Sequence, residues 1–315
     1  MSADANRFHR AVVIGTGMMG PGIAVTLAAG GLRVTLLSRK QETARAGLEK
    51  ALGQLDLLAA NGLVSEEAAE GARASLSASA DFDPSIREAD LVIESAPEDM
   101  EFKKRLFARM DALAAPEAVL ASNTSGLSIT EIASACTRPE RVLTTHFWNP
   151  PHLMPLVEVV KGEKTDPGVA AAVVDLLRRC GKTPVLVKKD TPGQLGNRLQ
   201  MALVREAIHI VESGIADPED VDLAAKTGFG LRLPVYGILE HQDMVGLDLG
   251  SRVLDYASRD LSNVRGLPRL VREKLEKGEL GVKTGKGFYD WSKKDAEAVK
   301  QRRDRFVLEF LKSRY

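Results

Sequence analysis

The sequence has few cysteines, no long apolar run and no excess of charge of either sign. Its two cysteines, Cys136 and Cys180, are too few and too isolated for a disulfide framework or a zinc site. No apolar run approaches the roughly 20 residues that a membrane-spanning helix needs, and the polar segment 1–10 lacks the apolar core of a signal peptide. Because 43 basic residues balance 43 acidic ones, the overall charge does not indicate binding to nucleic acid or to a membrane. These absences favour a protein of the reduced cytoplasm.

Short runs rich in Val, Ile and Leu alternate with Ala-rich helical stretches through the first half of the chain. This alternation is typical of α/β proteins, in which helices cover both faces of a parallel sheet and the strands are continuously apolar. The length of 315 residues also predicts more than one domain, since a single core rarely grows beyond about 250 residues. The predicted strands are residues 10–15, 32–38, 91–94, 119–122, 142–146, 156–160 and 185–187.

Two interruptions of this alternation of strands and helices predict the domain organisation. Residues 41–78 are charged and Ala-rich, which predicts a pair of helices projecting from the sheet, separated by Asn61-Gly62. After residue 188 the strand pattern fades, and the Pro192-Gly193 pair predicts a hinge before a helix over 195–213. We therefore expect a nucleotide-binding domain over residues 1–188 and an all-helical domain over residues 189–315.

A glycine-rich turn joins the first predicted strand to the first helix. It has the spacing G-x-G-x-x-G, in which the first glycine permits the tight turn, the second admits a pyrophosphate and the third allows close packing of helix and strand. Free amides at the start of the helix then face the phosphates. In this position the pattern predicts a doubly wound Rossmann-type domain that binds NAD or NADP. The turn residues assigned to the cofactor are Gly15, Gly17, Met18, Met19 and Gly20.

The end of the second predicted strand bears on the choice of cofactor. A site selective for NAD usually has an acidic residue there, which binds the ribose 2′-hydroxyl. This chain has Ser38 followed by Arg39. A hydroxyl and a guanidinium would accept a 2′-phosphate, which favours NADP. Alternatively, Arg39 points into solvent and the site takes NAD.

A histidine and a glutamate lie where a dehydrogenase would need them. Oxidation of an alcohol removes a proton from oxygen while a hydride leaves carbon, and histidine is the natural general base near neutral pH. His146 ends a predicted strand, where open α/β sheets bind their ligands. Glu158, in the next strand, would fix the imidazole tautomer. Alone, either residue would more simply be structural.

Five ordered motifs resemble the 3-hydroxyacyl-CoA dehydrogenase family, and together they cover essentially the whole chain. The segment from Lys189 to Arg198 resembles that family's hinge, and Gly281 to Tyr289 is similar to its C-terminal signature. The three motifs of the first half are Ser122-Asn123-Thr124-Ser125-Gly126, His146-Phe147-Trp148-Asn149-Pro150 and Leu156-Val157-Glu158.

The resemblance implies roles for individual residues. His146 would be the base and Glu158 its partner, while Ser125 and Asn197 would bind the substrate oxygen. Asn197 would come from the second domain, so that the site forms between the domains. The resemblance also implies fatty acid metabolism and a homodimer formed through the helical domain. Glu94, Lys103 and Asn123 match positions near the cofactor; alone, Glu94 is a strand-end acid and Lys103 a solvated helix charge.

Some departures from the family pattern leave the substrate open. The stretch from Pro150 to Glu158 looks more like branches that oxidise small hydroxy compounds without CoA, among them L-gulonate dehydrogenase and a pyridine-carboxylate dehydrogenase. Gln194 also replaces a family phenylalanine in the hinge. The leading hypothesis is a 3-hydroxyacyl-CoA substrate, with a free hydroxy acid or a hydroxymethyl aromatic acid as the alternative. A third alternative is a nucleotide-binding structural protein without catalysis, against which the retained site residues argue.

Overall fold

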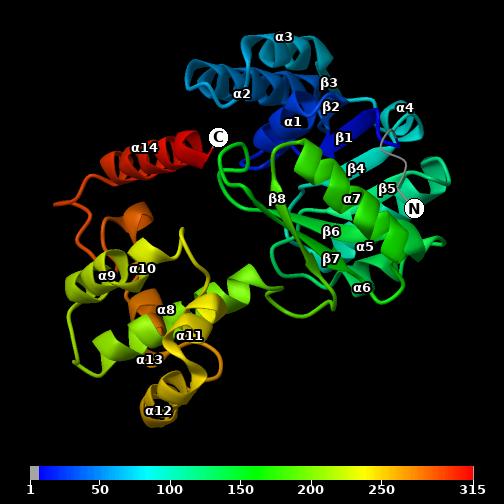
Figure 1. Ribbon diagram of the computed structural model, residues 1–315. Helices are drawn as coiled ribbons and strands as arrows, with labels where there is room; N and C mark the ends of the chain where they lie inside the picture. The colour runs from blue at the N-terminus through cyan, green and yellow to red at the C-terminus, as the bar shows by residue number, and fades with distance from the viewer. Residues whose placement is uncertain (1–6, 315) are drawn as a thin grey trace. The chain divides into compact units, whose positions relative to one another are not determined.

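A computed structural model describes residues 7–314 and contains one sheet with helices on both of its faces (Figure 1). The eight strands have the order β3-β2-β1-β4-β5-β6-β7-β8. Neighbours from β3 to β6 are parallel, β7 is antiparallel to β6, and β8 is parallel to β7. This is the predicted doubly wound, mainly parallel sheet. The strands are β1 (Arg10–Ile14), β2 (Arg33–Leu37), β3 (Leu76–Ser79), β4 (Leu91–Glu94), β5 (Val119–Ser122), β6 (Val142–Phe147), β7 (Leu156–Lys161) and β8 (Thr183–Val187).

Alternate side chains of the central strands enter two separate cores, because successive residues of a strand point to opposite faces of the sheet. In β4, Leu91 and Ile93 join one cluster, whereas Val92 joins the other. The first cluster includes apolar residues of α1 (Gly20–Ala29), α2 (Gln41–Ala60), α3 (Glu66–Ser75) and α7 (Pro167–Arg179). The second includes those of α4 (Phe82–Arg87), α5 (Met100–Leu113) and α6 (Ile129–Ala133), and η1 (Pro139–Arg141) precedes β6.

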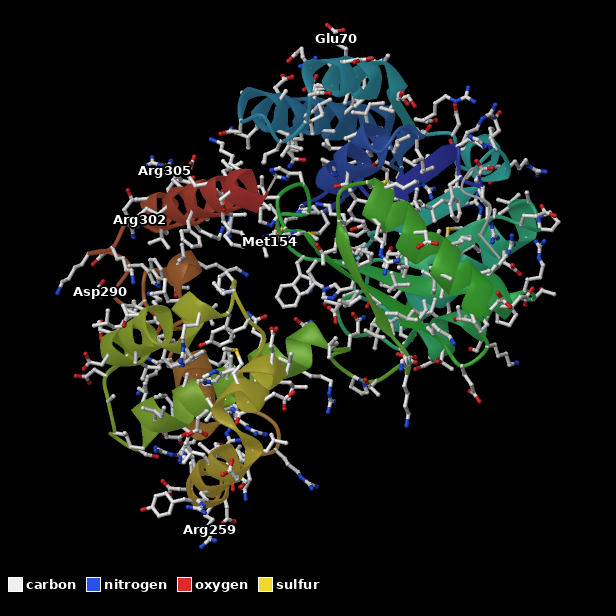
Figure 2. The ribbon with its side chains drawn as sticks, in the orientation of Figure 1. Glu70, Met154, Arg259, Asp290, Arg302 and Arg305 are labelled. Atoms are coloured by element: carbon white, nitrogen blue, oxygen red, sulfur yellow. The ribbon has the colours of Figure 1, made fainter. Side chains whose placement is uncertain are left out.

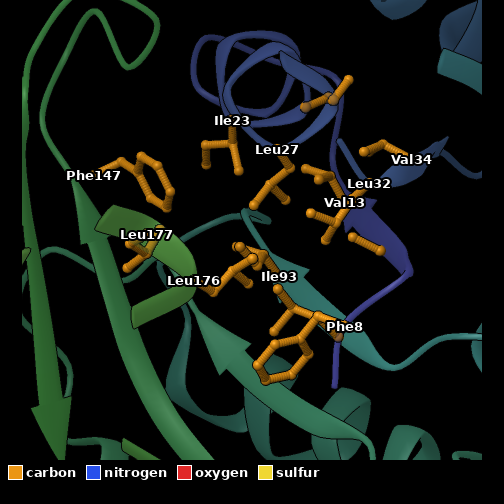
Figure 3. Close-up of a cluster of buried hydrophobic side chains, with 14 of the residues drawn as sticks. Phe8, Val13, Ile23, Leu27, Leu32, Val34, Ile93, Phe147, Leu176 and Leu177 are labelled. Carbon is orange, nitrogen blue, oxygen red and sulfur yellow. The ribbon is translucent and has the colours of Figure 1, made fainter. Parts of the chain in front are cut away.

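The larger core holds the glycine-rich turn and the strand ends in fixed positions. Ile23 and Leu27 of α1 point toward the side chains of Val13 and Ile93 on the sheet (Figure 3). All four are fully buried. Burial of side chains of this size stabilises the fold by roughly 1.5–3 kcal/mol each. The start of α1 is therefore held rigidly over the carboxyl ends of β1 and β4.

The excursion between β2 and β4 differs in one respect from the prediction. Helices α2 and α3 form as expected on either side of the Asn61-Gly62 break, and Glu70 lies on the outward side of α3 (Figure 2). The chain after α3, however, forms strand β3, which pairs in parallel with β2. The prediction of helix as far as residue 78 was wrong there. Leu76–Ser79 has the sequence LSAS, whose small and hydroxyl side chains give no apolar strand pattern.

The chain divides into two compact units, the first ending at Arg198 and resuming at Arg302, the second spanning Leu199–Gln301. This division lies later than the expected boundary after residue 188. It also returns most of the last helix to the first unit, where Leu311 is buried and Val307 and Leu308 pack against the larger core. The helices from residue 196 onward are α8 (Gly196–Glu212), α9 (Pro218–Thr227), α10 (Phe229–Arg232), α11 (Ile238–Val245), α12 (Leu247–Ala257), α13 (Arg269–Glu276), η2 (Val282–Thr284) and α14 (Ala296–Arg314).

Two expectations from the sequence concern membranes and the N-terminus. Among residues 7–314, none of the helices combines the length and the apolar character needed to cross a bilayer. The predicted absence of a signal-peptide core falls partly on residues 1–6, which lie outside the described residues.

Candidate active site

The glycine-rich turn has the backbone that a dinucleotide requires. Gly15 has φ +103°, and a Cβ atom there would collide with the carbonyl oxygen of Ser95. A Cβ atom on Gly20 would collide with the carbonyl of Gly15, so α1 begins directly against the turn. A Cβ atom on Gly17 would instead project into open space. That space, beside the first amides of α1, fits a bound pyrophosphate.

The methionines between these glycines differ in exposure. Met18 is 74% exposed at the tip of the turn, whereas Met19 caps α1 with its backbone and packs at the edge of the larger core. Met18 is therefore available to a ligand lying over the turn, and Met19 holds the turn to the protein.

At the end of β2, the serine and the arginine have different surroundings. The hydroxyls of Ser38 and Thr43 form a hydrogen bond of 2.6 Å. Arg39 is exposed, and its guanidinium forms no ion pair with any of residues 7–314. The end of β2 thus presents a pair of hydroxyls and an exposed guanidinium, with no carboxylate provided by either Ser38 or Arg39.

Glu94 and Lys103 form a buried ion pair at the end of β4. Lys103 Nζ lies 2.6 Å from Glu94 Oε1, and both side chains are at most 1% exposed. Ser122, at the end of β5, donates its hydroxyl to Glu94 Oε2 at 2.7 Å. Lys103 is therefore not the solvated helix charge of the simpler interpretation. The pair fixes the ends of two neighbouring strands to the start of α5.

Glu98, which the sequence analysis did not select, connects this ion pair to Ser125. Its Oε1 accepts hydrogen bonds from Thr124 Oγ1 at 2.6 Å and from the Ser125 amide at 2.8 Å, with Ser125 Oγ at 3.2 Å. Lys103 Nζ lies 3.4 Å from the other oxygen of Glu98. Burial alone would raise the pKa of Glu98, but Thr124, Lys103 and Ser125 together hold it below its usual value. Ser125 therefore lies beside a carboxylate whose ionised form is stabilised by its neighbours.

Asn123 joins three strand ends. Its Oδ1 accepts the amide of Phe147, at the end of β6, at 2.8 Å, and its Nδ2 donates to Ser95 Oγ, after β4, at 3.3 Å. The structure thus brings the predicted cofactor residue Asn123 to the same edge of the sheet as the end of β4. Open α/β sheets bind ligands at this edge.

His146 and Glu158 form a hydrogen-bonded dyad across β6 and β7. Their Nδ1 and Oε2 atoms are 2.7 Å apart, and Glu158 is fully buried. Burial would raise the pKa of Glu158, but hydrogen bonds from His146, the Gly196 amide, Trp148 and the Leu195 amide lower it to about 2. Glu158 is thus an anion at neutral pH. It requires a proton on Nδ1 of His146, which leaves Nε2 as the basic nitrogen.

Asn197 lies in the first unit, because that unit extends to Arg198. The division falls within the first turn of α8, so the expectation that Asn197 comes from the second domain stays a prediction. The helix α8 begins before the division, anchored by the amides of Leu195 and Gly196, which donate to Glu158 Oε1 at 2.9 and 2.8 Å. Asn197 Nδ2 donates to the Ser125 carbonyl at 2.9 Å. Asn197 and Ser125 are therefore neighbours, as their shared assignment to one substrate oxygen requires.

Two further residues, Trp148 and Gln194, contact the site although the sequence analysis assigned a role to neither of them. Trp148 Nε1 donates to Glu158 Oε2 at 3.0 Å, although it occupies the variable position of the His-Phe-x-Asn-Pro motif. Gln194, noted there only as a departure, is 3% exposed with φ +51°. Its Nε2 donates to the Thr124 carbonyl at 3.0 Å. Gln194 thus connects the segment before α8 to the loop after β5.

Comparison with known families agrees with this geometry. The NAD-binding domain of 3-hydroxyacyl-CoA dehydrogenase matches residues 10–191, and the C-terminal domain of the same enzymes matches residues 193–291. The chain belongs to the 3-hydroxyacyl-CoA dehydrogenase family. It is an NAD-dependent oxidoreductase, which disfavours the alternative of a structural protein without catalysis.

Relatives of two kinds are similar to this member of the family. One is 5-formyl-3-hydroxy-2-methylpyridine 4-carboxylate 5-dehydrogenase of Mesorhizobium japonicum, 37% identical over 94% of this chain and 95% of the relative. Another is a probable 3-hydroxybutyryl-CoA dehydrogenase of Bacillus subtilis, 38% identical over 90% of this chain and 97% of the relative.

Solved structures divide in the same way. A crystal structure of the pyridine 5-dehydrogenase, described as an NAD+-dependent dismutase, has a TM-score of 0.89 and 35% identity, and covers 96% of this chain and 97% of its own. The (S)-3-hydroxybutyryl-CoA dehydrogenase of Ralstonia eutropha has a TM-score of 0.75 and 32% identity, and covers 91% of this chain and 100% of its own.

Proposed function

We propose that this dehydrogenase transfers a hydride between NAD and the alcohol or aldehyde carbon of a small free acid, with His146 as the general base. The observation that carries the proposal is the dyad, in which a buried carboxylate holds the imidazole at Nδ1. Nε2 is then unprotonated and available to the hydroxyl of a substrate. Bound NAD supplies the hydride acceptor.

The proton follows a defined path in this mechanism. The hydroxyl of the alcohol, or of the hydrate that an aldehyde forms with water, gives its proton to Nε2 of His146 while a hydride leaves the carbon that bears this hydroxyl. The alcohol becomes a carbonyl, and the hydrated aldehyde becomes a carboxylic acid. Glu158 remains an anion and stabilises the imidazolium that forms. Because its pKa is about 2, Glu158 does not take the proton itself near neutral pH. In the reverse direction, the imidazolium returns the proton to the carbonyl oxygen.

Ser125 and Asn197 are proposed to hold the reacting oxygen. The hydroxyl of Ser125 lies 3.2 Å from Glu98, a longer contact than the 2.8 Å of its amide, so it can turn to a substrate while the amide keeps the loop in place. Asn197 is tied by one amide hydrogen to the Ser125 carbonyl. The second amide hydrogen of Asn197 is available as a donor to the reacting oxygen of the substrate.

The substrate class is supported by the relatives. The pyridine-carboxylate dehydrogenase matches a larger share of this chain than the 3-hydroxybutyryl-CoA dehydrogenase does, and its structure has the higher TM-score. We therefore place a ring-bearing hydroxymethyl or formyl acid first. A 3-hydroxyacyl-CoA is the second candidate, since both domains of the family match.

A substrate screen tests this choice. The purified protein would be given NAD with hydroxymethyl and formyl pyridine carboxylates, aliphatic hydroxy acids and 3-hydroxybutyryl-CoA, and the reduced cofactor would be followed by its absorbance. We expect the highest kcat/KM with a free ring acid. A kcat/KM for 3-hydroxybutyryl-CoA that exceeds every free acid would overturn the proposed substrate class while leaving the dyad mechanism intact.

For the cofactor, we propose that the site accepts NADP as well as NAD. The support is the exposed Arg39 and the absence of an acidic side chain at Ser38. A 2′-phosphate would pair with the guanidinium and meet no like charge at either position.

We also propose that two copies of the chain associate through the second unit. In Leu199–Gln301, all of which the structure describes, none of the apolar side chains is buried. Val235, Leu239 and Met244 are at least 70% exposed. Apolar surface of this extent marks an interface in soluble proteins. Sedimentation should give a dimer at micromolar concentration, and a monomer at every concentration would contradict this proposal.

A further inference from the structure

The indole of Trp148 shares one carboxylate oxygen with the imidazole of His146. Trp148 Nε1 and His146 Nδ1 lie 3.0 and 2.7 Å from Glu158 Oε2. The two rings are near each other, with centroids 5.8 Å apart and planes inclined by 46°. Both donors therefore draw on the negative charge of the same oxygen, and each weakens the bond that the other makes.

The position of the indole is fixed by packing. A Cβ atom on Gly196 would lie 2.5 Å from Cζ2 of Trp148, so the start of α8 rests directly against the ring. The amide of Gly196 meanwhile donates to the second oxygen of Glu158. Trp148 thus lies between the carboxylate and the first turn of α8 and contacts both.

Few other groups of the described chain contact the carboxylate of Glu158. The groups that contact its carboxylate are His146 of β6, Trp148 after β6, and the amides of Leu195 and Gly196 before α8. Within residues 7–314, His146 is the one ionisable side chain that bonds to it. Because the amides of Leu195 and Gly196 belong to the backbone, the indole N–H of Trp148 is the neutral donor to Glu158 that a substitution can remove.

We propose that Trp148 is a positioning residue, whose indole N–H draws charge from Glu158 Oε2 and so weakens the hold of that oxygen on a protonated His146. The inference rests on the proposed role of His146 as the base. Without the indole N–H, Glu158 would hold an imidazolium more tightly, and His146 would take up a proton at higher pH. Oxidation would then be several-fold slower on the acid side of the pH profile, where the imidazole must lose a proton before it can act as the base.

The first experiment does not need a substrate. The histidines are isotopically labelled, and the His146 resonance is identified from its loss in His146→Gln. Its titration by NMR is then compared in the natural protein and in Trp148→Phe. We expect the midpoint to move to higher pH by roughly half to one unit. An unchanged midpoint in a folded Trp148→Phe protein would overturn the proposal.

A second variant separates the hydrogen bond from the shape of the ring. Site-specific replacement of Trp148 by 3-benzothienylalanine exchanges the N–H for sulfur and keeps the two fused rings, so it also serves if Trp148→Phe does not fold. The midpoint should move to higher pH as in Trp148→Phe. A midpoint that stays at its natural value in this variant would overturn the proposal, because shape alone would then explain any effect of phenylalanine.

The control is Trp291→Phe, which removes the other tryptophan of the chain and should leave the His146 midpoint unchanged. With a substrate from the screen, the acid limb of the kcat/KM profile for oxidation should move by the same amount as the NMR midpoint. A moved midpoint in a protein that oxidises none of the free acids of the screen would overturn the proposed substrate class and leave the role of Trp148 standing.

Discussion

His146 and Glu158 are directly paired in the register of β6 and β7, the one antiparallel pair of neighbours in the sheet. Side chains of directly opposed residues lie on the same face, only about 5 Å apart at Cβ. A shift of one residue would send the carboxylate to the opposite face. The strands themselves, which are buried on both sides, therefore set the geometry of the dyad. The antiparallel reversal of β7 brings the carboxylate of Glu158 directly beside His146 of β6.

Glu158→Gln is expected to destabilise the protein by about 2–4 kcal/mol at neutral pH, because three donors besides His146 would face a neutral amide at a buried position. The pKa of Glu158 is lowered from 4.5 to about 2, so its stabilising effect is complete above 4.5 and is lost as the pH falls through 2. The difference from the natural protein should thus shrink between these values.

Urea unfolding from pH 7 down to about 3 measures this difference. The matched control is Glu163→Gln, an exposed acid shortly after β7, which should unfold like the natural protein. A Glu158→Gln difference that stays constant throughout the acid range would contradict the ionisation assigned to Glu158.

Lys103→Met should cost about 3–5 kcal/mol of stability, because it leaves the buried carboxylate of Glu94 without its partner. Adding Glu94→Gln to it should recover part of the loss. As a control, Arg259→Met removes the ion pair of Arg259 with Asp255, whose nitrogen and oxygen atoms are 2.5 Å apart and whose side chains are 71% and 72% exposed. Loss of this exposed pair should change the stability by less than about 1 kcal/mol. Equal losses from both single variants, measured by urea unfolding, would argue against a buried pair.

Ser38→Asp should lower the ratio of NADP to NAD efficiency about tenfold or more, since a carboxylate at the end of β2 repels a 2′-phosphate and binds a 2′-hydroxyl. The ratio of kcat/KM values for the two cofactors measures the effect. Ser251→Asp adds the same charge at an exposed position of α12 and should leave the ratio unchanged. If Ser38→Asp leaves it unchanged too, the end of β2 does not select the cofactor.

The sequence predicted those parts of the fold that depend on continuous burial. Strands such as β4 and β5 are apolar because both faces are covered, and their predicted limits agree with the structure. Strand β3 could not be predicted from an apolar pattern, since this serine-rich edge strand buries little apolar surface. The dyad was predictable because histidine and glutamate are chemically distinctive and occupy adjacent strands.

Other parts of the site depend on tertiary contacts that no local pattern encodes. Glu98 becomes important because the turn from β4 to α5 brings it to Ser125, a residue far along the chain. Lys103 resembles any surface lysine of a helix until α5 packs on the sheet. Trp148 occupies a motif position that carries no functional signal of its own, and only the geometry reveals its bond to Glu158.

The most direct test of the account is the rate of hydride transfer in His146→Gln under single-turnover conditions, with the substrate preferred in the screen. We predict a loss of about 10²–10⁴-fold with unchanged affinity for NAD, because the base is removed and the glycine-rich turn is not. The control His9→Gln, at an exposed position before β1, should transfer hydride normally. A His146→Gln protein that reduces NAD within a few-fold of the natural rate would contradict the central claim.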